Sequence, residues 1–422
     1  MKNLLLKFNP LPFLLLSTIF LVQCREHCDK IISTRQEAVE FLSFEELRAS
    51  QITFEEAHVL KKPGKIYVKD TYLFINEINE GIHVIDNSNP SAPITLGFLK
   101  IVGNVDISIR GNTLFADSYV DLLSIDISTI RNPKVLQRVE NIFENNFEIN
   151  ASKGIPIAWK TVEYIEENCY TPSNGIGCAN NDVSLDATSP EFLFDTANKA
   201  GGTGQGGSLA RFSVVSAYLY VLTFDTIEIY NLANSSQIKQ ESTITVGQGI
   251  ETIWAHQDKL FIGSTTGMYI YDNSNPTAPS FLSKYEHVFS CDPVVVEGDL
   301  AYVTLRMSEN EWACNRGFNR LEIVNISDPR NPRSVAMHGM SNPHGLGIDN
   351  GVLFICDGDA GLRVYDANNS QNLIELVHYQ GINSMDVIPL GDILLMIGED
   401  GFYQYDYSDL NNINLLSKIL VE

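Results

Sequence analysis

The chain has 422 residues, of which 44% are hydrophobic and 19% are charged. This composition suits a folded protein with a sizeable core and excludes a collagen-like, low-complexity or disordered chain. Acidic residues outnumber basic ones by 52 to 29, and the formal charge of -23 argues against a nucleic-acid partner, because an acidic surface repels phosphate backbones.

Residues 1–23 predict a secretory signal peptide. Lys2 and Lys7 give it a positively charged start, and a mainly apolar run from Leu11 to Val22 follows. Such a run is too short to cross a bilayer, which takes roughly 20 residues. No other stretch approaches that length, so the mature chain is predicted to have no transmembrane helix.

The signal ends in Leu21-Val22-Gln23-Cys24, which resembles a bacterial lipobox. The resemblance implies that Cys24 is the lipidated N-terminus of a membrane-anchored protein. Gln23 departs from the pattern, since a small residue is usual there, so the alternative is an ordinary signal with an undetermined cleavage site. Arg25 replaces the aspartate that retains such proteins at the inner membrane. The expected location is therefore the outer membrane or cell surface, with the periplasmic leaflet as the alternative.

An exported chain can form disulfide bonds. Besides Cys24 the cysteines are Cys28, Cys169, Cys178, Cys291, Cys314 and Cys356. The short loop between Cys169 and Cys178 makes this pair the first candidate disulfide, and Cys291 with Cys314 is the second. The alternative is that the cysteines are reduced and buried, where they act as small apolar side chains.

Residues 24–51 form a lead before the main domain and are predicted to tether or cover it. The segment Ser43-Phe44-Glu45-Glu46 fits a capping box, in which the serine and the second glutamate bond to free backbone N–H groups at a helix start. A helix is therefore predicted near residues 43–49.

The main domain, residues 52–422, contains a repeat of about forty residues. A clear copy runs from Ile82 to Asp86 and continues as Asn87-Ser88-Asn89-Pro90; another runs from Met268 to Asp272 with the same continuation. Two further clear copies and three degenerate ones bring the total to seven. Their anchor residues are Asp86, Asp126, Asn231, Asp272, Asn325, Asp366 and Asp406.

Each copy predicts four short strands separated by turns. In the sixth copy we expect strands at 345–349, 352–356, 362–365 and 373–379, with Asn350-Gly351 as a tight turn. Four strands in about forty residues is the period of a propeller blade, and a closed ring protects sheet edges. The predicted fold is all-β: a seven-bladed β-propeller of four-stranded antiparallel blades with a short N-terminal helical lead. Residues 52–60 and 415–420 are both candidates for the strand that closes the ring.

Two long copies indicate insertions, at about residues 141–208 and at residues 307–318. Insertions in repeat folds gather on one face, which is often the binding face, although a passive loop is the alternative. Gly202 to Gly207 matches GxGxxG but lacks the strand and helix of a dinucleotide site. Asp357 to Gly361 begins like a calcium loop but lacks the required glutamate, so a tight turn is predicted.

The repeat motif resembles the LVIVD-repeat family of bacterial β-propeller proteins, over roughly residues 50–420. The strings Asn342 to Gly347 and Gly398 to Asp406 also resemble lipoprotein members from Bacteroidetes and similar lineages. The resemblance implies a cell-envelope propeller. It implies neither an activity nor particular site residues.

Aligning the turns places Glu251, Asp292 and His344 at one equivalent position in three successive copies, just before the first strand. In propellers this strand lines the central channel. These side chains could bind a divalent metal or a cationic ligand at the channel mouth, or act as acid and base; a solvated channel mouth is the alternative. No catalytic residue is assigned, and a divalent cation is the one cofactor considered.

Two functions remain open. The first is a lipid-anchored binding or scaffold module in the cell envelope, facing a protein or glycan partner. The second is an extracytoplasmic enzyme or a metal-dependent small-molecule site at the channel mouth. Propellers host both, so the fold does not decide between them. The sequence lacks HExxH, GxSxG, Walker A and paired CxxC motifs, which favours the first.

Overall fold

The computed structural model describes residues 27–170, 204–234, 237–287, 293–307 and 318–422. The chain divides into two units, residues 1–40 with 158–189, and residues 41–157 with 190–422. In the first unit, β1 (His27–Leu42) and β11 (Ile155–Tyr170) form a two-stranded sheet; both strands continue a short way into the second unit. Within the described residues, no helix is long and apolar enough to cross a membrane.

The described part of the second unit contains seven blades, each with four antiparallel strands in chain order. Blade 1 contains β3 (Pro63–Lys69), β4 (Tyr72–Glu77), β5 (Gly81–Asp86) and β6 (Ile94–Lys100). Blade 2 contains β7 (Ile107–Arg110), β8 (Thr113–Ser118), β9 (Asp121–Asp126) and β10 (Lys134–Val139). Blade 3 contains β13 (Phe212–Val215), β14 (Tyr218–Leu222), β15 (Thr226–Asn231) and β16 (Lys239–Thr245).

The remaining blades repeat this order. Blade 4 contains β17 (Ile250–His256), β18 (Lys259–Ser264), β19 (Gly267–Asp272) and β20 (Ser280–Glu286). Blade 5 contains β21 (Val294–Glu297), β22 (Leu300–Leu305), β23 (Arg320–Asn325) and β24 (Arg333–Gly339). Blade 6 contains β25 (Leu346–Asp349), β26 (Val352–Cys356), β27 (Leu362–Asp366) and β28 (Ile374–Tyr379). Blade 7 contains β29 (Ser384–Leu390), β30 (Ile393–Gly398), β31 (Gly401–Asp406) and β32 (Asn414–Leu420).

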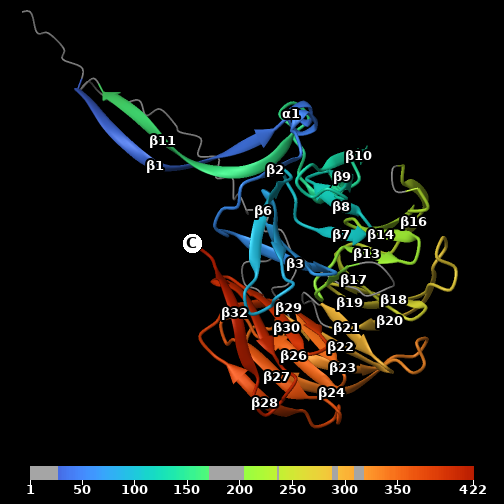
Figure 1. The fold of residues 1–422 in the computed structure, drawn as a ribbon. Helices are drawn as coiled ribbons and strands as arrows, with labels where there is room; N and C mark the ends of the chain where they lie inside the picture. Colours follow the sequence, from blue (N-terminus) through green and yellow to red (C-terminus); the bar gives the residue numbers. More distant parts are fainter. Residues whose placement is uncertain (1–26, 171–203, 235–236, 288–292, 308–317) are drawn as a thin grey trace, which may run out of the picture. The chain divides into compact units, whose positions relative to one another are not determined.

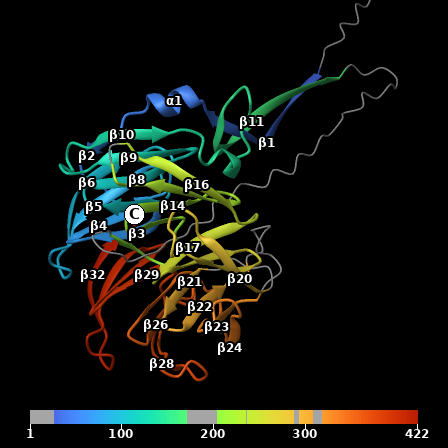
Figure 2. The same ribbon diagram turned by 90° about the vertical axis from the view of Figure 1, so that its right-hand side faces the viewer.

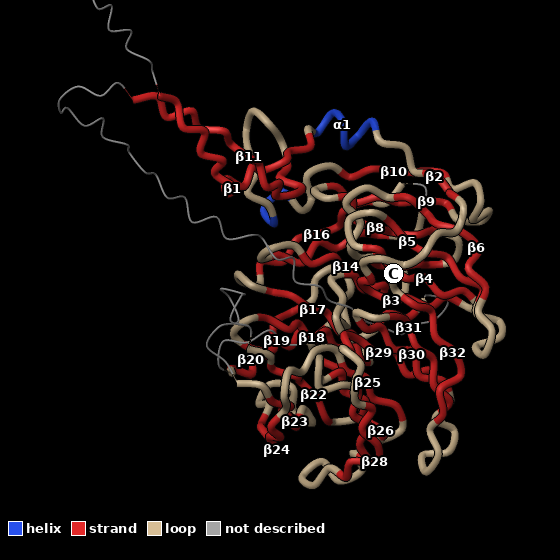
Figure 3. The backbone as a smooth tube through the Cα atoms, turned by 90° about the vertical axis from the view of Figure 1, so that its left-hand side faces the viewer, coloured by secondary structure: helices blue, strands red, loops and turns tan. Residues whose placement is uncertain are grey.

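The blades form a closed ring. The first strand of each blade contacts the first strand of the next, from β3 through β7, β13, β17, β21, β25 and β29 back to β3. Figures 1 and 2 both show the red seventh blade beside the blue first blade. Strands and loops make up nearly all of the described trace (Figure 3). The structure confirms the predicted seven-bladed β-propeller.

Each blade is apolar on both faces, because each face packs against a neighbouring blade. In β8, Leu114 and Ala116 pack against blade 1, whereas Phe115 between them packs against blade 3. All three are fully buried. Successive side chains of a strand point to opposite faces, so a strand buried on both sides is a nearly continuous apolar run.

The ring closes without exchanging a strand between its two ends. All four strands of blade 7 come from one stretch, with residues 415–420 in its outermost strand β32. Residues 52–60 contribute β2 (Thr53–Glu55), a fifth strand that pairs with β6 at the outer edge of blade 1. Closure depends on apolar packing between blades 7 and 1 and on a parallel bridge between Leu60 and Val421.

The repeat motif has a structural reason. The seven anchor residues end the third strand of their blades, and each side-chain oxygen accepts the backbone N–H two residues further on, at 2.8 to 3.1 Å. The intervening N–H bonds to the turn between the first two strands, as Ile326 N does to Asp299 O at 2.9 Å. Asp or Asn is required because its short side chain forms this turn, and both residue types can accept the bond.

The lead contains the predicted helix, α1 (Phe44–Ala49), with a complete capping box between Ser43 and Glu46. Leu47 is fully buried and packs with Val120. The Arg48 guanidinium bonds to both carboxylate oxygens of Asp121 at 3.1 Å. The helix therefore covers part of blade 2. A short 3-10 helix, η1 (Glu144–Asn146), follows that blade.

Among the other local predictions, the strands and turns of the sixth copy are confirmed and the disulfide bonds stay untested. The four strands of the sixth copy are confirmed within a residue or two, and Asn350 and Gly351 both have the positive φ of the predicted turn. The segment from Asp357 to Gly361 is a turn, and the Asp357 carboxylate pairs with Arg363 at 2.8 Å. Cys356 is buried and free. Neither candidate disulfide is tested, because Cys178, Cys291 and Cys314 lie outside the described residues and the side chain of Cys169 is not described.

We predict that Asn325→Ala destabilises the propeller by about 1 kcal/mol, because the bond to the Ser327 N–H at 3.1 Å is lost. Asn325→Asp restores an acceptor and should keep wild-type stability. Thermal unfolding of the two variants tests this. Equal melting temperatures for Asn325→Ala and Asn325→Asp would show that the anchor side chain does not stabilise the turn.

Candidate functional site

The structure describes two of the three residues that the sequence placed at the channel mouth. Glu251 is a buried residue of β17, at a bulge between Ile250 and Thr252. His344 precedes β25; its backbone N–H bonds to Cys356 O at 2.7 Å. Asp292 lies outside the described residues, so the group of three stays a prediction.

His344 is half-buried, and its carbonyl oxygen accepts a bond from Thr304 Oγ1 at 2.6 Å. Burial, together with the Arg306 charge, lowers the pKa of its imidazole to about 3. The side chain is therefore neutral at neutral pH. Glu251 and His344 belong to blades 4 and 6, and blade 5 stands between these blades in the ring.

In the aligned repeats, the position one residue after Glu251, Asp292 and His344 carries charged side chains that the sequence alone did not indicate. In blade order its residues are Lys65, Asp106, Arg211, Thr252, Pro293, Gly345 and Asp386. Four of the seven are ionisable. Adjacent residues of a strand point to opposite faces. An alignment of the repeats that is displaced by one residue therefore selects side chains on the other face.

A buried ion-pair network joins blades 1, 2 and 3. Lys65 Nζ donates to Asp106 Oδ2 at 2.7 Å, and only 3% of each side chain is exposed. Asp106 Oδ2 also accepts the backbone N–H of Arg211 at 2.8 Å. The Arg211 guanidinium bonds to Asp117 Oδ2 at 2.8 Å. Two positive and two negative side chains therefore pair across three neighbouring blades.

The second carboxylate of this network is held by the backbone before β7. Asp117 Oδ1 accepts the N–H groups of Val105 at 2.7 Å and Asp106 at 2.9 Å. Burial raises the pKa of Asp117, while Arg211 and these N–H donors oppose the rise. Removing one partner of such a group leaves a charge buried without compensation, so we interpret the network as a structural clamp on the ring.

Residues 204–210, which we call the channel segment, lie in the central channel of the ring. Gln205 and Gly206 form β12 (Gln205–Gly206), which pairs with β3 of blade 1. The Gly204 N–H bonds to Ile109 O of blade 2 at 3.1 Å, and Ile253 N of blade 4 bonds to Ala210 O at 2.8 Å.

Ser208 extends these contacts to the opposite side of the ring. Its Oγ accepts the Leu346 N–H of blade 6 at 2.7 Å, and its own N–H lies 3.3 Å from Asp386 Oδ1 of blade 7. A segment that bonds to blades 1, 2, 4, 6 and 7 must cross the channel, because only there are all the innermost strands within reach.

Two glycines allow the channel segment to lie this close to the blades. A Cβ at Gly204 would stand 2.1 Å from the Tyr67 ring, and one at Gly207 would stand 2.3 Å from the Asp386 carboxylate. The space left beside Lys65, Asp106 and Gly206 is about 10 Å³, room for about one water molecule. The Gly-rich run, which formally matches a nucleotide motif, therefore serves close packing in the described part of the channel.

Comparison with known proteins agrees with this architecture. The LVIVD repeat matches residues 62–99 and 251–287, which correspond to blades 1 and 4. Two blades thus carry LVIVD repeats. Together with the seven-bladed ring, these two matches support a relationship of the chain to LVIVD-repeat β-propellers. No curated protein matches the chain.

Several solved structures are similar to this chain at low sequence identity. The computationally designed protein Ika8 is 10% identical, with a TM-score of 0.51 over 88% of this chain and 90% of its own. BamB from Moraxella catarrhalis is 7% identical, with a TM-score of 0.49 over 89% and 97%. Sqt1 from Saccharomyces cerevisiae is 9% identical, with a TM-score of 0.48 over 88% of each chain. The similarity to Ika8 shows the fold alone.

We predict that Lys65→Met destabilises the propeller by about 3 kcal/mol, because Asp106 then keeps a buried charge without its partner. The double variant Lys65→Met/Asp106→Asn removes both charges and should recover much of the loss. Lys239→Met, which breaks an exposed pair with Glu241, should cost less than about 1 kcal/mol. Denaturant unfolding of all three checks this; a double variant no more stable than Lys65→Met would contradict the paired-charge interpretation.

Gly207→Ala should displace the channel segment and lower the melting temperature by several degrees. Hydrogen exchange of the amides in residues 204–210 should accelerate. Gly339→Ala is the matched control, because a Cβ there meets nothing within 4 Å. Wild-type exchange in Gly207→Ala would show that the segment is not tightly held.

Proposed function

We propose that this chain is a binding or scaffold module that recognises a protein partner through the outer strands of its blades. The observation that carries the proposal is a series of exposed apolar side chains on strands that, among the described residues, have no paired strand at their outer edge. Soluble chains normally protect such edges with charges, prolines or a covering segment, because an open edge pairs readily with another chain.

The outer strands of blades 2 to 7 are terminal in their sheets among the described residues: β10, β16, β20, β24, β28 and β32. Five of the six carry exposed large apolar residues. These are Val135, Phe281, Met337, Ile374, Leu376, Leu415 and Leu420. Among the described residues, no strand pairs with the outer edge of these five strands, and each of them carries an exposed apolar side chain, which suits recognition of an extended peptide by strand addition.

Blade 1 shows that a blade edge of this protein accepts an additional strand. The chain's own residues Thr53 to Glu55 pair antiparallel with Phe98 to Lys100 of β6. Phe54 packs there against the core between blades 1 and 2. A partner strand carrying an apolar side chain could pair with another blade in the same way.

Residues 204–210 lie in the central channel, so we place the proposed binding surface on the outside of the ring. These residues lie in the channel where an internal ligand would bind, and four of the charged side chains near them pair as Lys65 with Asp106 and Arg211 with Asp117. The sequence also lacks common catalytic motifs. A binding role therefore agrees with the geometry better than an internal catalytic site does.

The finer proposal places this module in the bacterial cell envelope, held by lipid at Cys24, where its partner is an envelope protein or a glycan. The support is the signal-like segment, the lipobox-like end at Cys24 and the LVIVD repeats. These residues of the leader lie outside the described part of the chain. Two acyl chains or more hold a protein firmly at a membrane, whereas one does not.

Affinity capture from the native cells, with cross-linking and mass spectrometry, tests the binding surface. A Phe281→Lys/Ile374→Lys variant adds charge to two exposed apolar positions and should lose a near-stoichiometric protein partner. The control Ser280→Lys/Gln371→Lys adds the same charge at neighbouring exposed polar positions and should keep it. An Asp292→Ala/His344→Ala variant should also keep it. Loss of the partner only in that last variant would instead favour a ligand site at the channel mouth.

Lipidation is tested separately. We expect the wild-type chain to incorporate labelled palmitate and to remain with the membrane fraction. Cys24→Ser should abolish the label and release the protein, because the acyl acceptor is lost. Cys356→Ser serves as the control, since Cys356 is buried. Label retained in Cys24→Ser would contradict the proposed anchor.

A further inference from the structure

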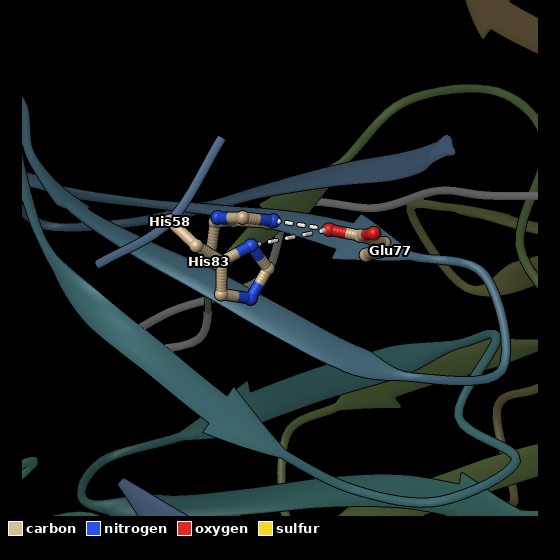
Figure 4. A group of neighbouring side chains, drawn as sticks. All are labelled: His58, Glu77 and His83. Carbon is tan, nitrogen blue, oxygen red and sulfur yellow. Dashed lines mark hydrogen bonds and ion pairs between the residues drawn. The ribbon is translucent and has the colours of Figure 1, made fainter. Parts of the chain in front are cut away.

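Two histidines and a glutamate meet at the seam where the ring closes. His83 lies in β5, Glu77 ends the neighbouring strand β4, and His58 lies between β2 and the bridge formed by Leu60. Figure 4 shows a nitrogen of each imidazole directed at the same carboxylate. His83 Nε2 is 2.6 Å from Glu77 Oε2, and His58 Nδ1 is 4.0 Å from it.

We propose that His58, Glu77 and His83 form a binding site for a divalent transition-metal ion, with Zn²⁺ as the preferred ion. One ligand atom from each residue lies within 4.8 Å of the other two. Two imidazoles and one carboxylate are a known donor set for zinc, and imidazole favours zinc and its neighbours over Mg²⁺ or Ca²⁺. This site is separate from the channel-mouth group and from the outer-strand surface.

The present distances need only small adjustments to hold an ion. Ligand atoms about 2.0 to 2.1 Å from a tetrahedral zinc are roughly 3.3 Å apart. The 2.6 Å bond between His83 and Glu77 must lengthen, and the 4.0 Å separation of His58 and Glu77 must shorten. His83 and Glu77 are buried and held by strands, whereas His58 is exposed in a connecting segment and can make most of the movement.

The surroundings orient the two rings. Phe98 of β6 packs against both imidazoles, with ring centroids 4.5 Å from His58 and 4.9 Å from His83. His58 Nδ1 also lies 2.9 Å from Val59 O, a contact that an ion would replace if this nitrogen became the ligand. A ring fixed before the ion arrives reduces the conformational entropy lost on binding.

A cavity leaves room for a further ligand. His58 and His83 line a space of about 280 Å³ together with Thr95 of β6 and Glu422 after blade 7. Three protein ligands beside an open space is the arrangement of zinc sites that bind water or a small molecule in the fourth position. The fourth ligand is then water entering from this cavity. The ion would also join residue 58 to blade 1 at the point where the ring closes.

Zinc binding to the full chain, produced without a histidine tag, tests the proposal. Equilibrium dialysis against Zn²⁺ with elemental analysis should give one ion per chain. Added Zn²⁺ should raise the melting temperature, and Co²⁺ in its place should give the visible absorption of a tetrahedral site. His58→Ala should weaken binding at least tenfold and remove both effects. Because His58 is exposed, this variant is expected to fold, and its unfolding in the absence of metal verifies that.

Glu77→Gln is a second variant that keeps the shape of the side chain and removes its charge; it should also weaken binding at least tenfold. His378→Ala is the matched control, because this half-buried histidine bonds only to Ala360 O among the contacts described. Zinc uptake that His378→Ala preserves and the other two variants lose supports the site. Failure of the wild type to retain an ion, or uptake unchanged in both His58→Ala and Glu77→Gln, overturns it.

Discussion

The structure depends on the burial of both faces of every blade. A single four-stranded sheet with apolar residues on both sides, such as blade 2 with Leu114 and Phe115 on opposite faces, cannot stay exposed to water. Each blade therefore needs two neighbours, and only a closed ring supplies two neighbours to all seven. Closure by packing is sufficient here, since the Ile66 and Ile388 faces of blades 1 and 7 join without a shared strand.

The first strands of all seven blades surround the central channel, and residues 204–210 of the same chain lie in it. Lys65 and Arg211 balance Asp106 and Asp117, so the buried charges stabilise the ring instead of repelling one another. Residues 204–210 then satisfy backbone and side-chain groups from five blades. The exposed apolar residues of the outer strands lie on the outside of the ring, where we propose that a partner binds.

The seam between blades 1 and 7 differs from the other blade contacts. Elsewhere the connection from one blade to the next is covalent, whereas blades 7 and 1 join through apolar packing, the Leu60–Val421 bridge and side-chain hydrogen bonds such as Asn87 Nδ2 to Gln404 Oε1 at 2.9 Å. The segment after β2 reaches this seam through Leu60, and it is where His58 meets Glu77 and His83. An ion at this point would join the segment that precedes blade 1 to two strands of that blade, beside the seam.

The sequence by itself determined the blade count, the strand positions in the sixth copy and the capped helix at Ser43, because turns, strands and caps depend on neighbouring residues. It also determined the anchors such as Asn325, whose partner is two residues away. Only the tertiary structure decided which residues meet across blades: Lys65 with Asp106, 41 residues apart, and Ser208 with Asp386, 178 residues apart. The same applies to the meeting of His58 and His83. The repeat gives the period of the chain, but a side chain's face changes with every residue, so contacts between blades follow from ring geometry and not from the local pattern.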